Sequence, residues 1–80
     1  MTKQIARQWQ QFERSSIPKT APPIQRQEMR RAFYAGAAAL LHLAKGLGDD
    51  ELTEDAGAAA LEAMQQEIME FFDRVAEGKA

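Results

Sequence analysis

Four side chains within one stretch of the sequence could together bind an anion. Arg26, Arg30 and Tyr34 are spaced i, i+4 and i+8, which places them on one ridge of a helix. Arg31 lies beside this ridge. A guanidinium group donates paired hydrogen bonds to a phosphate or a carboxylate, and an aromatic ring can stack on a nucleobase or cover a cation. The spacing therefore predicts a cradle for a small anion such as a nucleotide.

A second interpretation of the same arginines is purely structural. They could form ion pairs with carboxylates near the end of the chain, at Glu67, Glu70 and Asp73. Gln25 and Gln27 favour ligand binding instead, because they add neutral donors near a helix start, where free N–H groups already attract anions. The sequence leaves both interpretations open.

The sequence offers no recognisable catalytic or metal-binding set. His42 is the single histidine and has no Cys or Ser within helical reach, so it lacks the partners of a general base. One histidine without cysteines cannot form a zinc site, and the acidic cluster at 49–51 lacks the spacing of a calcium loop. Phosphate-binding glycine loops and the motifs HExxH and GxSxG are absent. We expect a protein that is not an enzyme and needs no metal or cofactor.

The length of the chain predicts one small domain spanning residues 1–80. A chain of this size buries only about 60% of its unfolded surface. Cys is absent, so no disulfide can stabilise the small core. Stability must come from close helix packing or from association between copies, and we expect a homo-oligomer.

The charges divide the chain into a basic and an acidic part. Residues 1–31 hold seven Lys or Arg against two Glu, a net charge of +5, whereas residues 32–80 hold three against ten Asp or Glu, a net charge of −7. This division indicates either a basic arm for an anionic partner or two parts that pack on each other. The overall charge of −2 argues against duplex DNA as the partner.

Targeting and membrane signals are missing from the sequence. No apolar segment follows the charged start, and the longest apolar run, 35–41, has seven residues, whereas a membrane span needs roughly 18. We expect a cytoplasmic protein without a membrane partner.

Apolar residues recur every three or four positions in three segments, which predicts an all-α protein with three helices. The predicted helices span about 3–14, 23–47 and 53–77, with a proline-containing joint at 15–22. Pro22 or Pro23 suits the first position of the second helix, because the missing N–H costs nothing there.

The helix ends carry their own signals. Thr2 and Thr53 are predicted to cap the first and third helices, since a threonine hydroxyl accepts a hydrogen bond from the first turn. Gly46 or Gly48 is available for a left-handed end of the second helix, and Gly78 ends the third.

The short connection after Gly48 predicts that the second and third helices form a long antiparallel hairpin. Positions whose numbers sum to about 101 then face each other: Leu40 with Leu61, Phe33 with Ile68, Met29 with Phe72, and Ala44 with Gly57. The short first helix is expected to lie across this hairpin or across a neighbouring subunit.

Two groups of residues are candidates for contacts between subunits. One is the apolar stripe of the first helix, and the other is a patch of the second helix where small residues permit close approach. The residues are Ile5, Trp9 and Phe12 in the first helix, and Gly36, Ala37 and Leu41 in the second.

Two motifs point to a known family. They are Trp9–Phe12, a Trp-Gln-Gln-Phe sequence, and 28–37, which reads Glu-Met-Arg-Arg-Ala-Phe-Tyr-Ala-Gly-Ala. With the proline-containing joint between them and an acidic final helix, they resemble a family of small helical proteins encoded by phages and prophages. The resemblance covers nearly the whole chain, and the family has no general function assigned to it.

The expected architecture is also similar to that of the helical sponge proteins with which phages blunt CBASS and Thoeris immunity. Those small oligomers sequester cyclic or ADP-ribose-type nucleotide signals between subunits through Arg, Lys and aromatic contacts. This likeness of fold implies a phage counter-defence protein that binds a nucleotide immune signal without chemistry. The alternatives are a protein-binding inhibitor of a bacterial defence complex, similar to an anti-CRISPR protein, or a small regulatory or structural phage protein.

Overall fold

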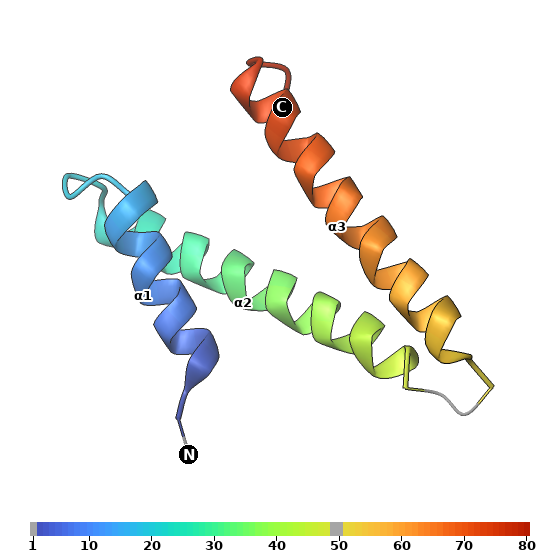
Figure 1. Ribbon diagram of the computed structural model, residues 1–80. Helices are drawn as coiled ribbons and strands as arrows, with labels where there is room; N and C mark the ends of the chain where they lie inside the picture. Colours follow the sequence, from blue (N-terminus) through green and yellow to red (C-terminus); the bar gives the residue numbers. More distant parts are fainter. Residues whose placement is uncertain (1, 49–50) are drawn as a thin grey trace. The chain divides into compact units, whose positions relative to one another are not determined.

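The computed structural model describes residues 2–48 and 51–80. In these residues the chain forms three α-helices and no strand, which confirms the predicted all-α class (Figure 1). The helices are α1 (Gln4–Ser16), α2 (Pro23–Gly46) and α3 (Glu54–Ala76). Their ends lie within two residues of the predicted ends. Asp49 and Asp50, from the acidic cluster at 49–51, lie outside the described residues.

The start of α1 differs from the prediction. The N-cap residue is Lys3, and no side chain accepts a hydrogen bond from the first turn. Thr2 stands one residue too early for its hydroxyl to reach the helix and offers only its carbonyl oxygen, to the Gln4 N–H at 3.1 Å. The residue type predicted that Thr2 caps the helix. This prediction is wrong, because the first helical turn begins too late in the sequence for the Thr2 hydroxyl to reach it.

Proline chemistry ends α1 and begins α2. Ile17 takes an extended conformation (φ −107°, ψ 123°), as expected for the residue before Pro18. The Pro18 carbonyl oxygen then accepts a hydrogen bond from the Ala21 N–H at 3.0 Å, which turns the chain. Pro23 is the first residue of α2, as predicted, because that position needs no N–H donor.

The C-terminal end of α2 is a tight turn. The N–H groups of Leu47 and Gly48 donate to the carbonyl oxygens of Ala44 and Lys45, both at 3.1 Å. In the described residues the only positive φ belongs to Gly78, so the left-handed glycine predicted for the end of α2 is not present. Hydrogen bonds three residues apart satisfy these carbonyl groups instead.

The start of α3 carries its predicted cap. Thr53 Oγ1 accepts a hydrogen bond from the Ala56 N–H at 3.1 Å. Glu54 and Asp55 occupy the first turn, where negative charge interacts favourably with the helix dipole.

The end of α3 is a Schellman motif centred on Gly78. This residue has φ +74°, a conformation that glycine adopts without steric cost. The N–H groups of Gly78 and Lys79 donate to the carbonyl oxygens of Val75 at 3.0 Å and Arg74 at 2.8 Å. The prediction that Gly78 ends the third helix is confirmed.

Contacts divide the chain into two units, residues 1–43 and residues 44–80, and each is described by itself. The first unit contains α1 and most of α2, and the second contains α3. Trp9 and Ile17 are the buried residues of the described chain, each 5% exposed, and both belong to the first unit. The core thus lies where α1 packs on α2. The antiparallel hairpin, the single domain and the homo-oligomer stay predictions.

Candidate functional site

Three aromatic rings hold α1 against α2. Trp9 and Phe12 of α1 and Phe33 of α2 lie with ring centroids 5.6 to 5.9 Å apart. The Trp9 and Phe33 rings meet edge to face, at 64° between their planes. Such aromatic pairs contribute about 0.5–1.5 kcal/mol beyond their buried area. The rings fix the distance between the two helices. They thereby also fix the width of the surface depression that lies between α1 and α2.

Arg26 is engaged by groups of its own unit. Its Nη1 lies 3.2 Å from Oε2 of Glu13, and its Nη2 donates a hydrogen bond to the Pro18 carbonyl oxygen at 2.7 Å. The partner is therefore a carboxylate of α1, a residue that the sequence analysis did not consider. Glu13 stands four residues after Trp9, so the helical spacing places it on the same face of α1 as the aromatic contact. This four-residue spacing is the sequence feature that could have identified Glu13 as the partner of Arg26.

Arg30 and Arg31 differ from Arg26 in their interaction partners. The guanidinium carbon of Arg30 lies 5.7 Å from the centroid of the Tyr34 ring. Across residues 2–48 and 51–80, neither Arg30 nor Arg31 forms an ion pair with a carboxylate. The ring orients the Arg30 cation without neutralising its charge. Both guanidinium groups keep their donors for another acceptor.

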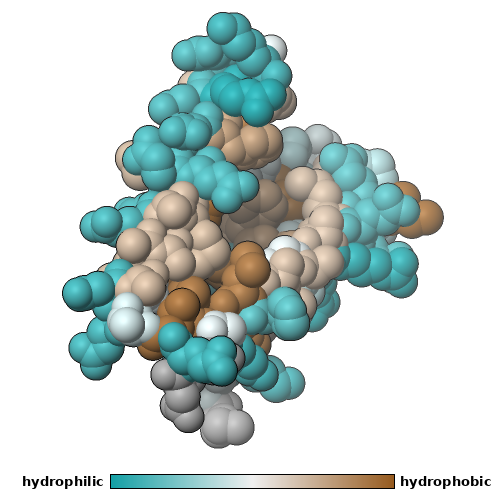
Figure 2. Space-filling model, turned by 90° about the vertical axis from the view of Figure 1, so that its right-hand side faces the viewer, coloured by the Kyte–Doolittle hydropathy of each residue, from teal (hydrophilic) through white to brown (hydrophobic). Residues whose placement is uncertain are grey.

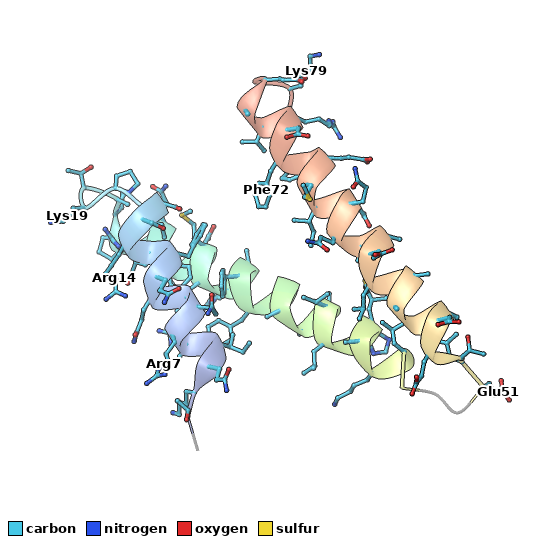
Figure 3. All side chains as sticks on the ribbon, in the orientation of Figure 1. Arg7, Arg14, Lys19, Glu51, Phe72 and Lys79 are labelled. Carbon is cyan, nitrogen blue, oxygen red and sulfur yellow. The ribbon has the colours of Figure 1, made fainter. Side chains whose placement is uncertain are left out.

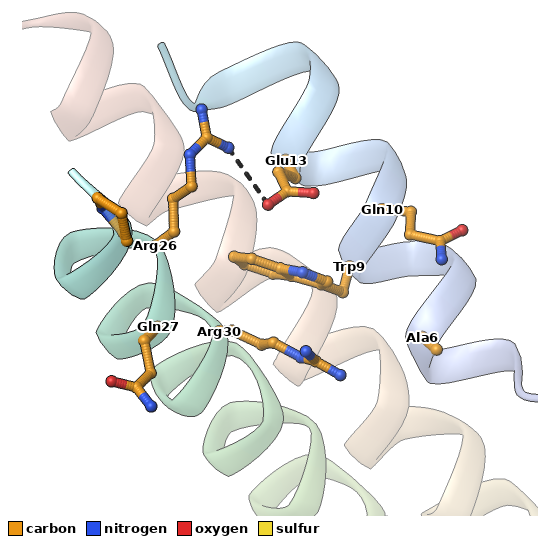
Figure 4. A pocket seen from close by; sticks show the side chains of 8 residues that line it. Ala6, Trp9, Gln10, Glu13, Arg26, Gln27 and Arg30 are labelled. Atoms are coloured by element: carbon orange, nitrogen blue, oxygen red, sulfur yellow. Dashed lines mark hydrogen bonds and ion pairs between the residues drawn. The ribbon is translucent and has the colours of Figure 1, made fainter. Parts of the chain in front are cut away.

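Two shallow depressions flank Arg30. One, of about 390 Å³, runs between α1 and α2, and the other, of about 380 Å³, lies on α2. Figure 4 shows the Trp9 indole of the first depression between the side chains of Arg26 and Arg30. The first depression is lined by Ala6, Trp9, Gln10, Glu13, Pro23, Arg26, Gln27 and Arg30. The second is lined by Gln27, Arg30, Arg31 and Tyr34.

The depressions divide the predicted site. The structure brings Arg30, Arg31 and Tyr34 together and places Arg26 in the neighbouring depression. Gln27 lines both, as does Arg30. Sequence reasoning identified these α2 residues but missed the contribution of α1, because tertiary packing, including that of Trp9 and Phe12 on Phe33, brings the two helices together.

The residues predicted for subunit contacts are spread over the first unit. Trp9 and Phe12 pack inside it, while Ile5 is 46% exposed. On α2, Gly36 and Leu41 are exposed and Ala37 is half-buried. Whether any of these residues contacts another subunit stays a prediction.

The polar groups that line the two depressions are mainly hydrogen-bond donors. Guanidinium and amide groups donate hydrogen bonds, and the Glu13 carboxylate is held by Arg26. Within the described ranges, no cluster of three or more His, Cys, Asp or Glu could hold a metal ion. The same residues include no helix with the length and apolar character of a membrane span.

Comparison with known proteins adds no relative. No family model matches the chain, and no curated protein or solved structure matches it either. The likeness to phage proteins therefore rests on the motifs at 9–12 and 28–37.

Proposed function

We propose that the chain is a binding protein that holds a phosphate-bearing nucleotide at Arg30, Arg31, Gln27 and Tyr34 without reacting with it. The surroundings of the Arg30 guanidinium group are the main support for this proposal. Its guanidinium group is oriented by the Tyr34 ring at 5.7 Å, borders both depressions and has no carboxylate partner in the described chain. Arg26 supports the site indirectly, because its bonds to Glu13 and Pro18 hold α1 and the joint beside it.

The donor pattern favours a ligand with several anionic oxygens. Each guanidinium group presents five N–H donors and no acceptor, and Arg30 and Arg31 are adjacent in the chain. A phosphate or pyrophosphate group satisfies such donors, whereas a neutral sugar does not. Tyr34 as a residue is 37% exposed, which favours access of a nucleobase to its ring.

We place this binding in phage counter-defence, as the likeness of the expected architecture to phage sponge proteins implies. The protein would sequester a nucleotide immune signal in the cytoplasm of an infected or lysogenic bacterium. Sequestration requires affinity alone, which suits depressions lined by donors. The proposal includes the α2–α3 antiparallel hairpin and the assembly of copies into a homo-oligomer, with the ligand near a subunit boundary.

The test is direct binding to candidate signals. Cyclic dinucleotides, cyclic trinucleotides and ADP-ribose derivatives are screened by thermal shift and then by calorimetry. We expect one class to raise the melting temperature and to be released intact on heat denaturation. Arg30→Ala should weaken binding about 10- to 100-fold, since a charged hydrogen bond contributes roughly 1.5–3 kcal/mol.

Arg14→Ala is the matched control. Arg14 is an exposed arginine that projects from α1 (Figure 3), so its replacement removes the same charge at a position outside both depressions. This variant should bind within twofold of the wild type. The proposal fails if none of the nucleotides binds, or if Arg14→Ala loses as much affinity as Arg30→Ala.

A protein-binding inhibitor of a defence complex is the second candidate. It is favoured by the large apolar side chains that α3 leaves exposed, among them Phe72 at 62%. Such an inhibitor would co-purify with one host complex at fixed stoichiometry and would bind none of the nucleotides. These two readouts separate the candidates.

A further inference from the structure

We propose that α3 pairs with α3 of a second copy of the chain through an apolar stripe along its length. The stripe consists of Leu61, Met64, Ile68, Phe71, Phe72 and Val75. The spacing of three or four residues places these side chains on one face of the helix. This inference rests on the self-association included in the proposed function, but not on the ligand.

The other described residues of its own unit, 44–80, do not bury the stripe. No residue of α3 is buried, and five of the six side chains in the stripe are 45% to 62% exposed. Figure 3 shows Phe72 standing clear of the α3 ribbon. Figure 2 shows that hydrophobic residues are exposed at the surface of the molecule among hydrophilic ones. An exposed apolar surface of this extent marks an interaction site.

The hairpin alone does not account for the whole stripe. Its predicted register pairs Ile68 with Phe33 of α2. Phe33, however, already packs against Trp9 and Phe12 of α1, with centroid distances of 5.6 Å in both cases. Since Phe33 is already used in this way, we infer that the hairpin closes only near its turn, where the register places Ala44 opposite Gly57, and that the stripe pairs with a second copy.

The size of the stripe matches what a stable dimer needs. A typical interface buries about 800 Å² per partner, and about 65% of that area is apolar in homodimers, which is about 500 Å². A large apolar side chain has roughly 150–200 Å² of surface. The five side chains that are about half exposed offer roughly 400–500 Å² together. One copy of the stripe on each side therefore suffices.

The stripe is also complementary to itself. Two antiparallel α3 helices that cross at Ile68 place Leu61 against Val75 of the partner subunit. The same arrangement places Met64 against Phe72 of the partner subunit. This is a two-fold contact, the commonest type in homo-oligomers. Helical spacing places the Glu70 and Asp73 carboxylates on the side of α3 opposite the stripe, so pairing leaves them in water.

The mass of the full chain in solution tests the pairing. Sedimentation equilibrium of the wild type should give about twice the chain mass of 8.9 kDa at micromolar concentration. Phe72→Glu and Ile68→Glu should each raise the dissociation constant at least tenfold, with the helical circular dichroism retained. Ile24→Glu is the control, because Ile24 is 71% exposed on α2 and lies outside the stripe. It should leave the dimer intact.

Cysteine cross-linking gives a second measurement that does not depend on a disruptive charge. The chain has no Cys, so a single introduced thiol reports one position. Ile68→Cys should form a covalent dimer under mild oxidation, because the two-fold axis passes close to this residue. Gln66→Cys, on the opposite side of α3, should cross-link only at the collisional rate.

The outcomes separate this inference from the proposed function. A wild type that stays monomeric at about 200 μM overturns both the α3 pairing and the proposed self-association. A dimer that survives Phe72→Glu and Ile68→Glu, or equal cross-linking of Ile68→Cys and Gln66→Cys, overturns the α3 pairing alone. Nucleotide binding is measured on the same samples and decides the ligand question independently.

Discussion

The Arg26 guanidinium group lies 3.2 Å from the Glu13 carboxylate and so joins α2 to α1. The same side chain reaches the Pro18 carbonyl oxygen at 2.7 Å. One arginine therefore links both helices and the joint between them. Arg30, one helical turn later, has no such partner among the described residues and faces two depressions. Two arginines four residues apart thus differ in role: one stabilises the unit and the other is available to a ligand.

The Arg26–Glu13 pair predicts a measurable coupling. Arg26→Ala and Glu13→Gln should each lower the free energy of unfolding by about 0.5–1.5 kcal/mol, since the pair is partly exposed and Arg26 also loses its bond to Pro18. Urea denaturation of both variants and the double variant should give a coupling of about 0.5 kcal/mol. Additive losses would show that the ion pair contributes nothing.

Trp9 should be the most sensitive position of the first unit. It is 5% exposed and contacts both Phe12 and Phe33, so Trp9→Ala should cost about 3 kcal/mol or more. Ile5→Ala, at an exposed position of the same apolar stripe, should cost less than about 0.5 kcal/mol. Denaturation followed by circular dichroism measures both. Equal losses would contradict the placement of the core at Trp9.

Periodicity predicted the helices well, because it depends on local spacing. Pro23 and Gly78 lie where their backbone chemistry requires, at the start of α2 and just after α3. The partner of Arg26 could not be read in the same way. Its choice of Glu13 depends on how α1 lies on α2, and the rings of Trp9 and Phe33 decide that arrangement.

The candidate site was predictable to the same extent. The ridge of Arg30 and Tyr34 follows from an i, i+4 spacing within one helix, and the structure shows that contact. The depression between α1 and α2 was not predictable, because Gln10 and Trp9 line it only through tertiary packing. Local patterns thus identified the arginines. The fold pairs Arg26 with Glu13 and leaves Arg30 without a carboxylate partner among the described residues.

The Thr53 cap predicts a loss confined to the start of α3. Thr53→Ala removes the acceptor of the Ala56 N–H and should lower the free energy of unfolding by about 1 kcal/mol. Thr2→Ala serves as the comparison, because Thr2 caps no helix and its replacement should change stability by less than about 0.3 kcal/mol. Amide exchange of residues 54–57 would locate the effect. Unchanged protection there in Thr53→Ala would count against the cap.

Tyr34 should contribute to ligand affinity through its ring and not through its hydroxyl. The ring lies 5.7 Å from the Arg30 guanidinium carbon and orients that group. Tyr34→Ala should weaken nucleotide binding about two- to fivefold, as expected for a cation–π contact of roughly 0.5–1 kcal/mol. Tyr34→Phe keeps the ring and should bind like the wild type. If calorimetry finds Tyr34→Phe as weak as Tyr34→Ala, the hydroxyl group is the contact and the orienting role is wrong.

Gly36 distinguishes the two possible surfaces for self-association. It lies inside α2, and a Cβ atom added there would meet nothing within 4 Å of it. Gly36→Ala should therefore raise the free energy of unfolding by about 0.5–1 kcal/mol, because alanine favours the helix. Ala38→Gly, the reverse change two residues later, should lower it by a similar amount. If the stripe on α3 forms the dimer, Gly36→Ala also leaves the sedimentation mass unchanged. A dimer weakened by this one methyl group would instead place the close helix contact at Gly36, as the small-residue patch of the sequence predicts.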